Sequence, residues 1–320
     1  MGDMEWPIRF EDVCDARGRI REWLDPTPLA TYRELDRETG ARVLVKHEDK
    51  NPTGSFKARN GLAVLTAWGP GPGVVAATRG NHGLGVAWAG SRLNVPVTIC
   101  VPRGNSPAKN AAIRELGAEL VEEGRDYDEA VLTMRRLVQE RGLREVHSTN
   151  EPLVIAGAGT LTLEIVEQAD RLDAMVVAIG GGSQAVGALT VLRALRPDVK
   201  VYGVQAAGAA AIHDSWHARA PLTRPSALTF ADGLATRMSY ELTFPALCAG
   251  LQDFVTVSDA EIGAALRTLR RITGTTPEGA GAAGLAGLVK LGLSRRTVAI
   301  VISGANIDAD TLRRVLEGHL

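Results

Sequence analysis

Cysteine, aromatic residues and long apolar runs are all scarce in this chain of 320 residues. The three cysteines, Cys14, Cys100 and Cys248, have no CxxC spacing, which predicts free and mostly buried thiols in a reducing compartment. No apolar run is long enough to span a membrane, and the first residues, MGDMEWPIRFEDV, lack a signal pattern. We therefore expect a soluble, cytoplasmic protein.

An excess of charge of either sign is also lacking. The net charge is −1 and the isoelectric point is about 6.6, so electrostatics give no case for binding nucleic acid or an anionic membrane. Lysine supplies only six of the 36 basic residues, which leaves few candidates for covalent chemistry at an amine. These lysines are Lys46, Lys50, Lys57, Lys109, Lys200 and Lys290.

Glycine and apolar residues, in contrast, are abundant. The 35 glycines and 45% hydrophobic content suit an α/β protein with many tight turns between strands and helices. Apolar runs predict strands near residues 43–48, 73–78, 95–101, 119–121, 145–148, 174–179, 200–205, 253–257 and 297–302. Helical spacing predicts helices at 10–23, 57–68, 81–91, 109–116, 127–141, 159–169, 183–195 and 278–291, with another after Ser258.

This alternation predicts an α/β fold with two open, twisted, mostly parallel sheets that carry helices on both faces. We expect residues 45–150 to form a small domain, and residues 1–44 and 151–320 to form a large one. The segment 207–236 has few periodic stretches and is expected to be irregular.

The turn Asn51-Pro52-Thr53-Gly54 leads into the helix that begins near Lys57. A positive potential at a helix N-terminus favours the neutral amine that forms an imine with an aldehyde. The apolar ring of Phe56 is expected to act in the same direction. Lys57 is therefore a candidate covalent anchor for an aldehyde cofactor, although an ordinary surface lysine would have the same local sequence.

Three further loops follow predicted strands, at the sheet edge where open α/β proteins bind ligands. The Thr78-Arg79-Gly80-Asn81-His82-Gly83 loop suits a carboxylate, and the Gly180-Gly181-Gly182-Ser183 loop opens a helix and suits a phosphate. Ser303, at the end of the last strand, could meet a ring nitrogen without protonating it.

Other interpretations of these motifs are weaker. A dinucleotide fold is disfavoured because the glycine loop fails GxGxxG and the next strand ends in Gln205 rather than an acid. His213 and His217 are spaced i,i+4 without an HExxH motif, and we interpret them as partly exposed helix residues. Glu278 opens a helix, where a carboxylate is favoured in any case.

Together, these motifs resemble the fold-type II pyridoxal-phosphate enzymes, which are tryptophan synthase β-like, and in particular the threonine/serine dehydratase branch. NPTGSFKARNG is similar to the lysine motif of that family, TRGNHGLGVAWA to its asparagine loop, GGGSQAVG to its phosphate loop and ISGANID to its C-terminal serine motif. LVIAGAGTLTLEI and the TPEGAGAAGLA helix also fit, so the resemblance covers nearly the whole chain.

The resemblance implies a role for each matching residue. Lys57 would bind pyridoxal 5′-phosphate and move the Cα proton, Phe56 would pack near the pyridine ring, Asn81 would bind the ring oxygen and Ser303 the ring nitrogen. The phosphate would lie on Gly180, Gly181, Gly182 and Ser183. The substrate carboxylate would lie on Thr78, Gly80 and His82, with Gly233 on the opposite wall.

Three departures from the family pattern matter. Arg79 stands where related racemases carry a serine that serves the opposite face of Cα, which favours lyase chemistry over racemisation. A hypothesis is that Arg79 reaches an anionic group of the substrate. Gln205 and Ala211 stand at the carboxylate positions of the family's divalent-cation site, so we expect no metal. The chain also leaves no room for the regulatory domain of biosynthetic relatives, so we expect no feedback by isoleucine.

The predicted reaction is β-elimination of L-threonine or L-serine to a 2-oxo acid and ammonia. Alternatives are β-replacement of the synthase type, an ammonia-lyase for another 3-substituted amino acid such as 3-hydroxyaspartate or a diamino acid, and a non-catalytic binding module with the same fold. We expect a small amino-acid substrate as the main partner and a homodimeric assembly.

Overall fold

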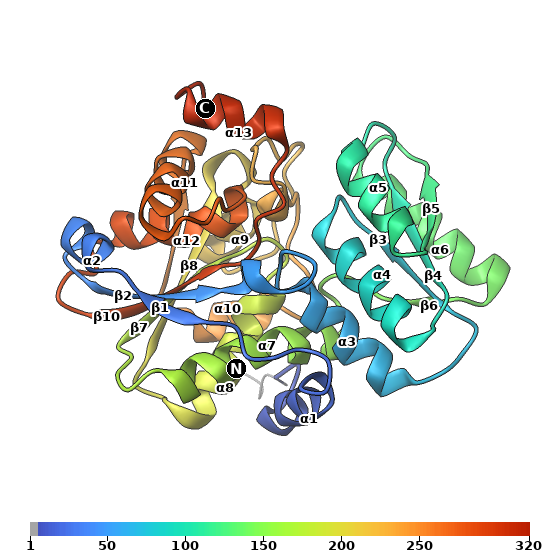
Figure 1. The fold of residues 1–320 in the computed structure, drawn as a ribbon, viewed down its shortest axis with the longest axis horizontal. Helices are drawn as coiled ribbons and strands as arrows, with labels where there is room; N and C mark the ends of the chain where they lie inside the picture. The colour runs from blue at the N-terminus through green and yellow to red at the C-terminus, as the bar shows by residue number, and fades with distance from the viewer. Residues whose placement is uncertain (1–5) are drawn as a thin grey trace.

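Two separate β-sheets organise the chain, of which the computed structural model describes residues 6–320 except the side chain of Asp128 (Figure 1). The larger sheet has six strands in the order β1-β2-β10-β7-β8-β9, and the smaller has four in the order β5-β4-β3-β6. All neighbouring strands are parallel except β1 and β2, which are antiparallel. The predicted mostly parallel α/β architecture is therefore confirmed. The N-terminal segment in which we expect no signal sequence begins outside the described residues.

The bounds of the elements are as follows. The strands are β1 (Leu29–Thr31), β2 (Arg42–His47), β3 (Val74–Ala77), β4 (Val97–Val101), β5 (Glu119–Glu122), β6 (Arg144–Glu145), β7 (Ala174–Ala178), β8 (Lys200–Ala206), β9 (Asp253–Val257) and β10 (Thr297–Ile302). The helices are α1 (Phe10–Ile20), α2 (Arg33–Thr39), α3 (Lys57–Trp68), α4 (Asn81–Leu93), α5 (Pro107–Glu115), α6 (Tyr127–Arg141), α7 (Pro152–Gln168), α8 (Ser183–Leu195), α9 (Ala211–Ala218), α10 (Phe244–Gly250), α11 (Asp259–Thr273), α12 (Gly279–Leu291) and α13 (Ala309–Leu316).

The central strand β10 shows why the larger sheet is covered on both faces. All of its side chains are apolar or small and buried, and successive side chains point to opposite faces. Val298 and Ile300 pack in a cluster with α11 and α12, whereas Ala299 and Val301 belong to the cluster with α7 and α8. Figure 1 shows these helix pairs on opposite sides of the sheet.

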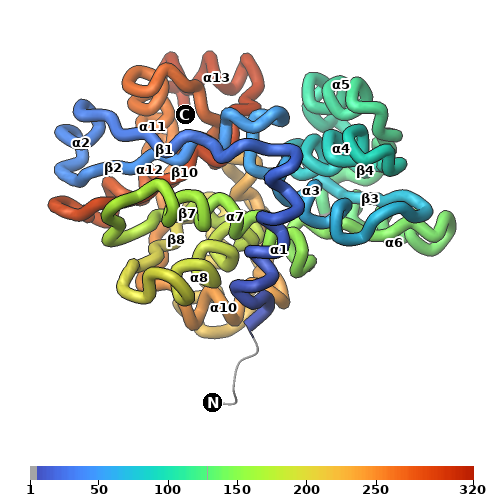
Figure 2. Tube along the Cα trace, turned by 60° about the horizontal axis from the view of Figure 1, so that its bottom comes forward, coloured from blue at the N-terminus to red at the C-terminus, as the bar shows by residue number. Residues whose placement is uncertain are grey.

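The four-stranded sheet with its helices is called here the small body, and the six-stranded sheet with its helices the large body. Helix α3 lies between the two bodies in both views and joins them (Figures 1 and 2). It packs against α4 of the small body on one side and against α7 of the large body on the other. The approach to α4 requires a glycine, because a Cβ at Gly85 would lie 2.2 Å from the carbonyl oxygen of Lys57. The helix that begins at Lys57 is therefore held from both sides.

The predicted elements are mostly in place, with some corrections. The segment 207–236 is not wholly irregular, because it contains α9. Helix α7 begins seven residues before the predicted start, since Pro152 occupies its first turn and the Glu151 side chain accepts from the Leu153 amide. Helix α1 ends at Ile20 rather than at residue 23. Sequence patterns also missed β1, α2, α10 and α13, which are short.

Two other expectations can be compared with the structure. Only Cys100 is buried among the three cysteines, while Cys14 is exposed on the outer face of α1. The predicted domain boundary at residue 45 lies inside β2, which pairs with β10 in the larger sheet. The domain division itself stays a prediction.

Candidate active site

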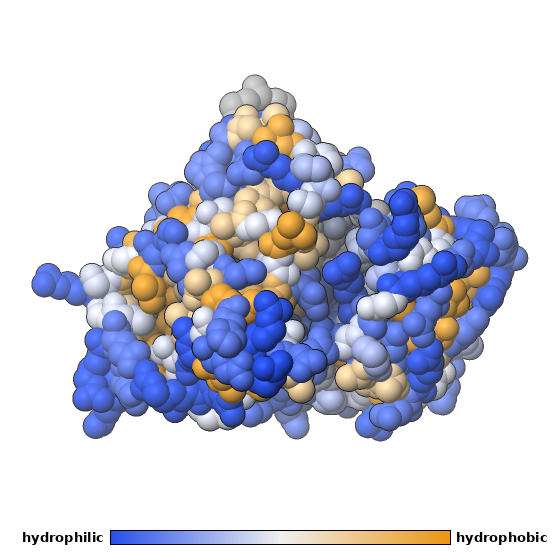
Figure 3. Space-filling view, turned by 90° about the horizontal axis from the view of Figure 1, so that it is seen from above, coloured by the Kyte–Doolittle hydropathy of each residue, from blue (hydrophilic) through white to orange (hydrophobic). Residues whose placement is uncertain are grey.

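One cavity lies where the four loops meet, between the two bodies of the molecule, and Figure 3 shows the surface hollowed there. Every residue that the sequence predicted for the site lines it. These residues are Phe56, Lys57, Thr78, Arg79, Gly80, Asn81, His82, Gly180, Gly181, Gly182, Ser183, Gly233 and Ser303. The structure thus brings them together, and the role of each stays a prediction.

The lysine turn is fastened to the end of β10. The Phe56 amide donates to the Ser303 carbonyl at 3.0 Å, and the Ala305 amide donates to the Gly54 carbonyl at 2.9 Å. Gly54 has a φ of 65°, a left-handed conformation that glycine adopts without strain. These bonds fix the start of α3 beside Ser303, whose hydroxyl makes no hydrogen bond within residues 6–320.

The environment of Lys57 favours its neutral form. Burial lowers the pKa of the Lys57 amine from an ordinary 10.5 to about 8. Its Nζ lies 4.8 Å from the centre of the Phe56 ring. The face of an aromatic ring attracts a cation, whereas its bulk excludes water, so the expected effect of Phe56 on the Lys57 amine stays a prediction. Desolvation lowers the pKa and prepares the amine for imine formation.

Asn81 is held by partners on both sides of its amide. Its Nδ2 donates to Glu278 Oε1 at 2.6 Å, and its Oδ1 accepts from Asn306 Nδ2 at 2.8 Å. Asn306 is fixed in turn by donating to the Thr53 carbonyl at 2.8 Å. One N–H of the Asn81 amide remains for a ligand, as a ring oxygen would require.

Glu278 also lines the cavity, which its sequence position suggested only weakly. Burial raises the pKa of its carboxyl group to about 7, although Lys109 and the bond from Asn81 favour the ionised form. In the sequence, Glu278 was marked only by its position at the start of a helix, where a carboxylate that merely caps the helix would also be found. Only the packing of α12 against the site shows that it faces Asn81.

The glycine loop leaves no room for side chains. A Cβ at Gly180 would lie 2.0 Å from the Gly233 carbonyl oxygen, and one at Gly181 would lie 1.9 Å from Thr149 Oγ1. Gly182 has a φ of 99° and directly precedes α8. The first N–H groups of a helix have no intrahelical acceptor, so this loop with the start of α8 forms an anion cradle.

The loop between β3 and α4 lines the same cavity. Thr78 Oγ1 organises it by accepting from the amides of Gly80 at 2.9 Å and Gly83 at 3.3 Å. His82 Nε2 lies 2.9 Å from the Val146 carbonyl oxygen and donates to it, and burial lowers the pKa of its ring to about 3. The neutral His82 ring thus has its donor turned away, so any contact with a carboxylate comes from its backbone amide.

Several lining residues were not predicted from the sequence. Lys109 Nζ lies 3.1 Å from Asp232 Oδ2, and this pair connects α5 of the small body with the segment beside Gly233. Tyr127, Thr149 and further residues also line the cavity. No local motif marks these residues, because distant segments bring them to the site.

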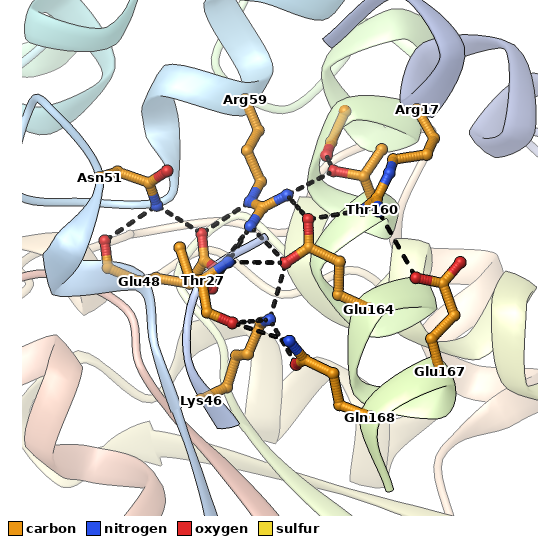
Figure 4. Close-up of polar contacts among 11 residues, drawn as sticks. Arg17, Thr27, Lys46, Glu48, Asn51, Arg59, Thr160, Glu164, Glu167 and Gln168 are labelled. Atoms are coloured by element: carbon orange, nitrogen blue, oxygen red, sulfur yellow. Dashed lines mark hydrogen bonds and ion pairs between the residues drawn. The ribbon is translucent and has the colours of Figure 1, made fainter. Parts of the chain in front are cut away.

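A buried network of charges supports the base of α3, two residues after the candidate anchor (Figure 4). Arg59 is fully buried and forms ion pairs at 2.7 Å with both Glu48 and Glu164. Lys46 is also buried and pairs with Glu164 at 2.7 Å. These contacts lower the pKa of Glu164 despite its burial and join β2, α3 and α7.

Side chains at and near the positions where we expect no metal site make hydrogen bonds within the protein. Gln205 Oε1 accepts from the His213 amide at 3.0 Å, and Ala211 is the first residue of α9. His213 Nδ1 lies 3.0 Å from Asp214 Oδ1, and His217 Nε2 lies 3.0 Å from the Phe254 carbonyl oxygen. Among the side chains that the structure describes, no group of three or more His, Cys, Asp or Glu is placed to hold a metal ion.

The fold and the site define a class of protein. A desolvated lysine, a serine hydroxyl at a strand end, an oriented asparagine and an anion cradle surround one cavity at the carboxyl ends of parallel strands. This donor set fits the aldehyde, ring nitrogen, ring oxygen and phosphate of pyridoxal 5′-phosphate. The class is that of the fold-type II pyridoxal-phosphate enzymes.

Comparison with known proteins agrees. Residues 20–304 match the family described as pyridoxal-phosphate dependent enzyme, and the chain belongs to this family. It is 36% identical to an L-threonine ammonia-lyase of Thermotoga maritima, over 98% of this chain and 79% of that one. It is 34% identical to an L-threo-3-hydroxyaspartate ammonia-lyase of a Pseudomonas species, over 97% and 98%. A crystal structure of a threonine deaminase from T.th. superposes with a TM-score of 0.90 at 35% identity, covering 94% and 99%.

No helix within residues 6–320 has the length and apolar content needed to cross a membrane.

Proposed function

We propose that this chain catalyses β-elimination of a small β-hydroxy amino acid, L-threonine or L-serine, to a 2-oxo acid and ammonia. The observation that carries the proposal is Lys57, an amine with its pKa lowered to about 8, in one cavity with Ser303, Asn81 and the glycine loop. Relatives named threonine ammonia-lyase and threonine deaminase support this reaction type.

Pyridoxal phosphate, when bound, supplies an electron sink for the pair left on Cα. Lys57 holds the cofactor and then takes the Cα proton. The backbone amides of Asn81 and His82 bind the substrate carboxylate, Thr78 Oγ1 holds the loop in place through the Gly80 amide, and the remaining side-chain N–H of Asn81 orients the ring. Ser303 meets the ring nitrogen without protonating it.

Loss of the β-hydroxyl as water then gives an enamine, which tautomerises and is hydrolysed in solution to the 2-oxo acid and ammonia. Arg79 lies in the carboxylate loop, and a guanidinium offers N–H donors but no acceptor for a proton. It therefore cannot serve as a second acid/base on the opposite face of Cα. Elimination is favoured over racemisation for this reason.

The test is the pair Lys57→Ala and Lys50→Ala. Lys50 is an exposed lysine on the same segment, with 57% of its side chain accessible, so it controls for loss of a nearby positive charge. We expect Lys57→Ala to lose the bound cofactor's visible absorbance and at least a hundredfold of turnover, and Lys50→Ala to keep both. Retention of both by Lys57→Ala would disprove the proposal.

A panel of β-substituted amino acids, scored for 2-oxo acid, ammonia and absorbance, separates elimination from replacement. A new amino acid formed without ammonia would indicate β-replacement. We further propose that the enzyme acts in the cytoplasm as a homodimer without a divalent cation. Light scattering on the holoenzyme, and activity with and without EDTA, test the last two points.

A further inference from the structure

Arg79 lies at the junction of two adjoining cavities. It follows Thr78 at the end of β3 and lines the active-site cavity. It also lines a second cavity, called here the outer cavity, whose walls include Asp126, Tyr127, Arg237 and Tyr240. Tyr127 and Tyr240 line both cavities, so the two spaces adjoin beside Arg79.

The Arg79 side chain is exposed and has no hydrogen-bond or ion-pair partner within residues 6–320. The neighbouring cations are already engaged: Lys109 pairs with Asp232 at 3.1 Å, and Arg237 lies 3.9 Å from Asp126. Lys57 serves the cofactor. Arg79 therefore contributes a positive charge to the mouth of the active-site cavity that no described protein group neutralises.

A substrate carboxylate at Cα does not require this charge. The amides of Gly80 and Gly83 donate to Thr78 Oγ1, but those of Asn81 and His82, which open α4, have no acceptor among the described residues and suit one carboxylate under the proposed function. A guanidinium presents a planar set of donors that matches a carboxylate in two parallel hydrogen bonds. A free arginine beside an existing carboxylate site thus suits a second anionic group of the same ligand.

We propose that Arg79 binds an anionic group on the β-carbon of the substrate, so that the enzyme prefers β-hydroxy amino acids with a carboxylate side chain. The inference rests on the proposed β-elimination and changes its preferred substrate from L-threonine or L-serine to an acidic β-hydroxy amino acid. With 3-hydroxyaspartate, the Cα–H and Cβ–OH bonds break, water leaves, and hydrolysis of the resulting enamine's imine tautomer consumes one water. The net products are 2-oxosuccinate and ammonia, with no oxidant or reductant needed.

Binding of unreactive ligands to the holoenzyme tests the inference apart from turnover. L-aspartate carries the second carboxylate and L-2-aminobutyrate does not, and neither has a β leaving group. Dissociation constants from absorbance titration are compared for the natural chain, Arg79→Gln, Arg79→Lys and the control Arg103→Gln. Arg103 is an exposed arginine of the small body that lines neither cavity.

We expect Arg79→Gln to raise the dissociation constant of L-aspartate roughly tenfold or more, because a charged hydrogen bond is lost. The dissociation constant of L-2-aminobutyrate should rise less than twofold. Arg79→Lys should restore part of the lost affinity for L-aspartate, and Arg103→Gln should change neither dissociation constant. In Arg79→Gln, the ratio of kcat/KM for 3-hydroxyaspartate to kcat/KM for L-threonine should fall by about the same factor as the affinity for L-aspartate. Equal weakening of both ligands would show that Arg79 binds the α-carboxylate, and no weakening would show that it binds neither. Either result overturns the inference.

The natural chain provides an independent test if Arg79→Gln does not fold. Tighter binding of L-2-aminobutyrate than of L-aspartate would overturn the inference by itself. If the enzyme converts L-threonine and Arg79→Gln leaves the binding of L-aspartate unchanged, only this inference is overturned. Absence of elimination from every substrate would remove the proposed function as well.

Discussion

At the scale of single residues, the chemistry of Lys57 depends on how far its neighbours exclude water from the amine. The amine lies in a desolvated site with no carboxylate partner within residues 6–320, and burial is the sole cause of its lowered pKa. Glu278 is affected in the opposite sense, because burial raises the pKa of a carboxyl group. The site thus contains two groups whose pKa values lie near neutrality, about 8 and about 7.

The pKa of Lys57 predicts how cofactor attachment depends on pH. Attack on an aldehyde requires the neutral amine, and below a pKa of about 8 its fraction falls tenfold per pH unit. When pyridoxal phosphate is added to the cofactor-free protein, the rate should rise with pH up to about 8 and then level off. Stopped-flow absorbance between pH 6 and 10 measures this.

The same reaction with N-acetyl-lysine amide provides the control, because it pairs the same aldehyde with an amine of ordinary pKa, 10.5. Its rate should still rise between pH 8 and 10, where the rate with the protein levels off. A protein rate that continues to rise past pH 9.5, as an ordinary lysine would give, would contradict the lowered pKa.

At the scale of elements, α3 is the part that carries the candidate chemistry. Its first residue is Lys57, and its base is held by Arg59 against Glu48 near β2 and Glu164 on α7. The two buried cations and two buried anions of this network balance one another. Removing one partner leaves a buried charge without compensation. The free-energy cost of this exceeds the net stabilisation that the intact pair provides.

We therefore predict that Arg59→Met lowers the free energy of unfolding by roughly 3–5 kcal/mol. The exposed control Arg103→Met should change it by less than about 0.5 kcal/mol. Urea unfolding of the cofactor-free proteins, followed by circular dichroism, measures both. A loss for Arg59→Met of under about 1 kcal/mol would mean that the network is only weakly coupled to folding.

At the scale of the whole molecule, the apolar core does not stop at the boundary between the two bodies. The main cluster contains Ala76 and Ile99 of the smaller sheet together with Val177 and Val301 of the larger one. Helices α3, α4 and α7 connect them. The two sheets are separate, but the side chains between them form one packed unit.

This continuity predicts a single cooperative unfolding transition. Tryptophan fluorescence and circular dichroism of the cofactor-free protein should give the same urea midpoint, because neither body can expose the shared helices alone. Gly85→Val, which would place a Cβ 2.2 Å from the Lys57 carbonyl oxygen, should lower both midpoints together. Two separated transitions would show that the bodies unfold independently.

The sequence by itself determined the class of fold and the four loops. The spacing of apolar runs fixed the order of strands and helices, and glycine turns marked their ends, because both signals are local. Lys57 and Ser303 could be proposed from their places beside predicted strands, and the resemblance to a family then assigned both to one named cofactor. Short elements such as α2 and α10 left too weak a periodic signal to be predicted.

Only the tertiary structure decided what surrounds the chemistry. Glu278 lies against Asn81 because α12 packs on the larger sheet, and Lys109 meets Asp232 because the two bodies face each other. The pKa of Lys57, the orientation of the His82 ring and the lack of a described partner for Arg79 depend on residues far apart in the chain. Desolvation and partner choice are properties of packing, and no local pattern of residues encodes them.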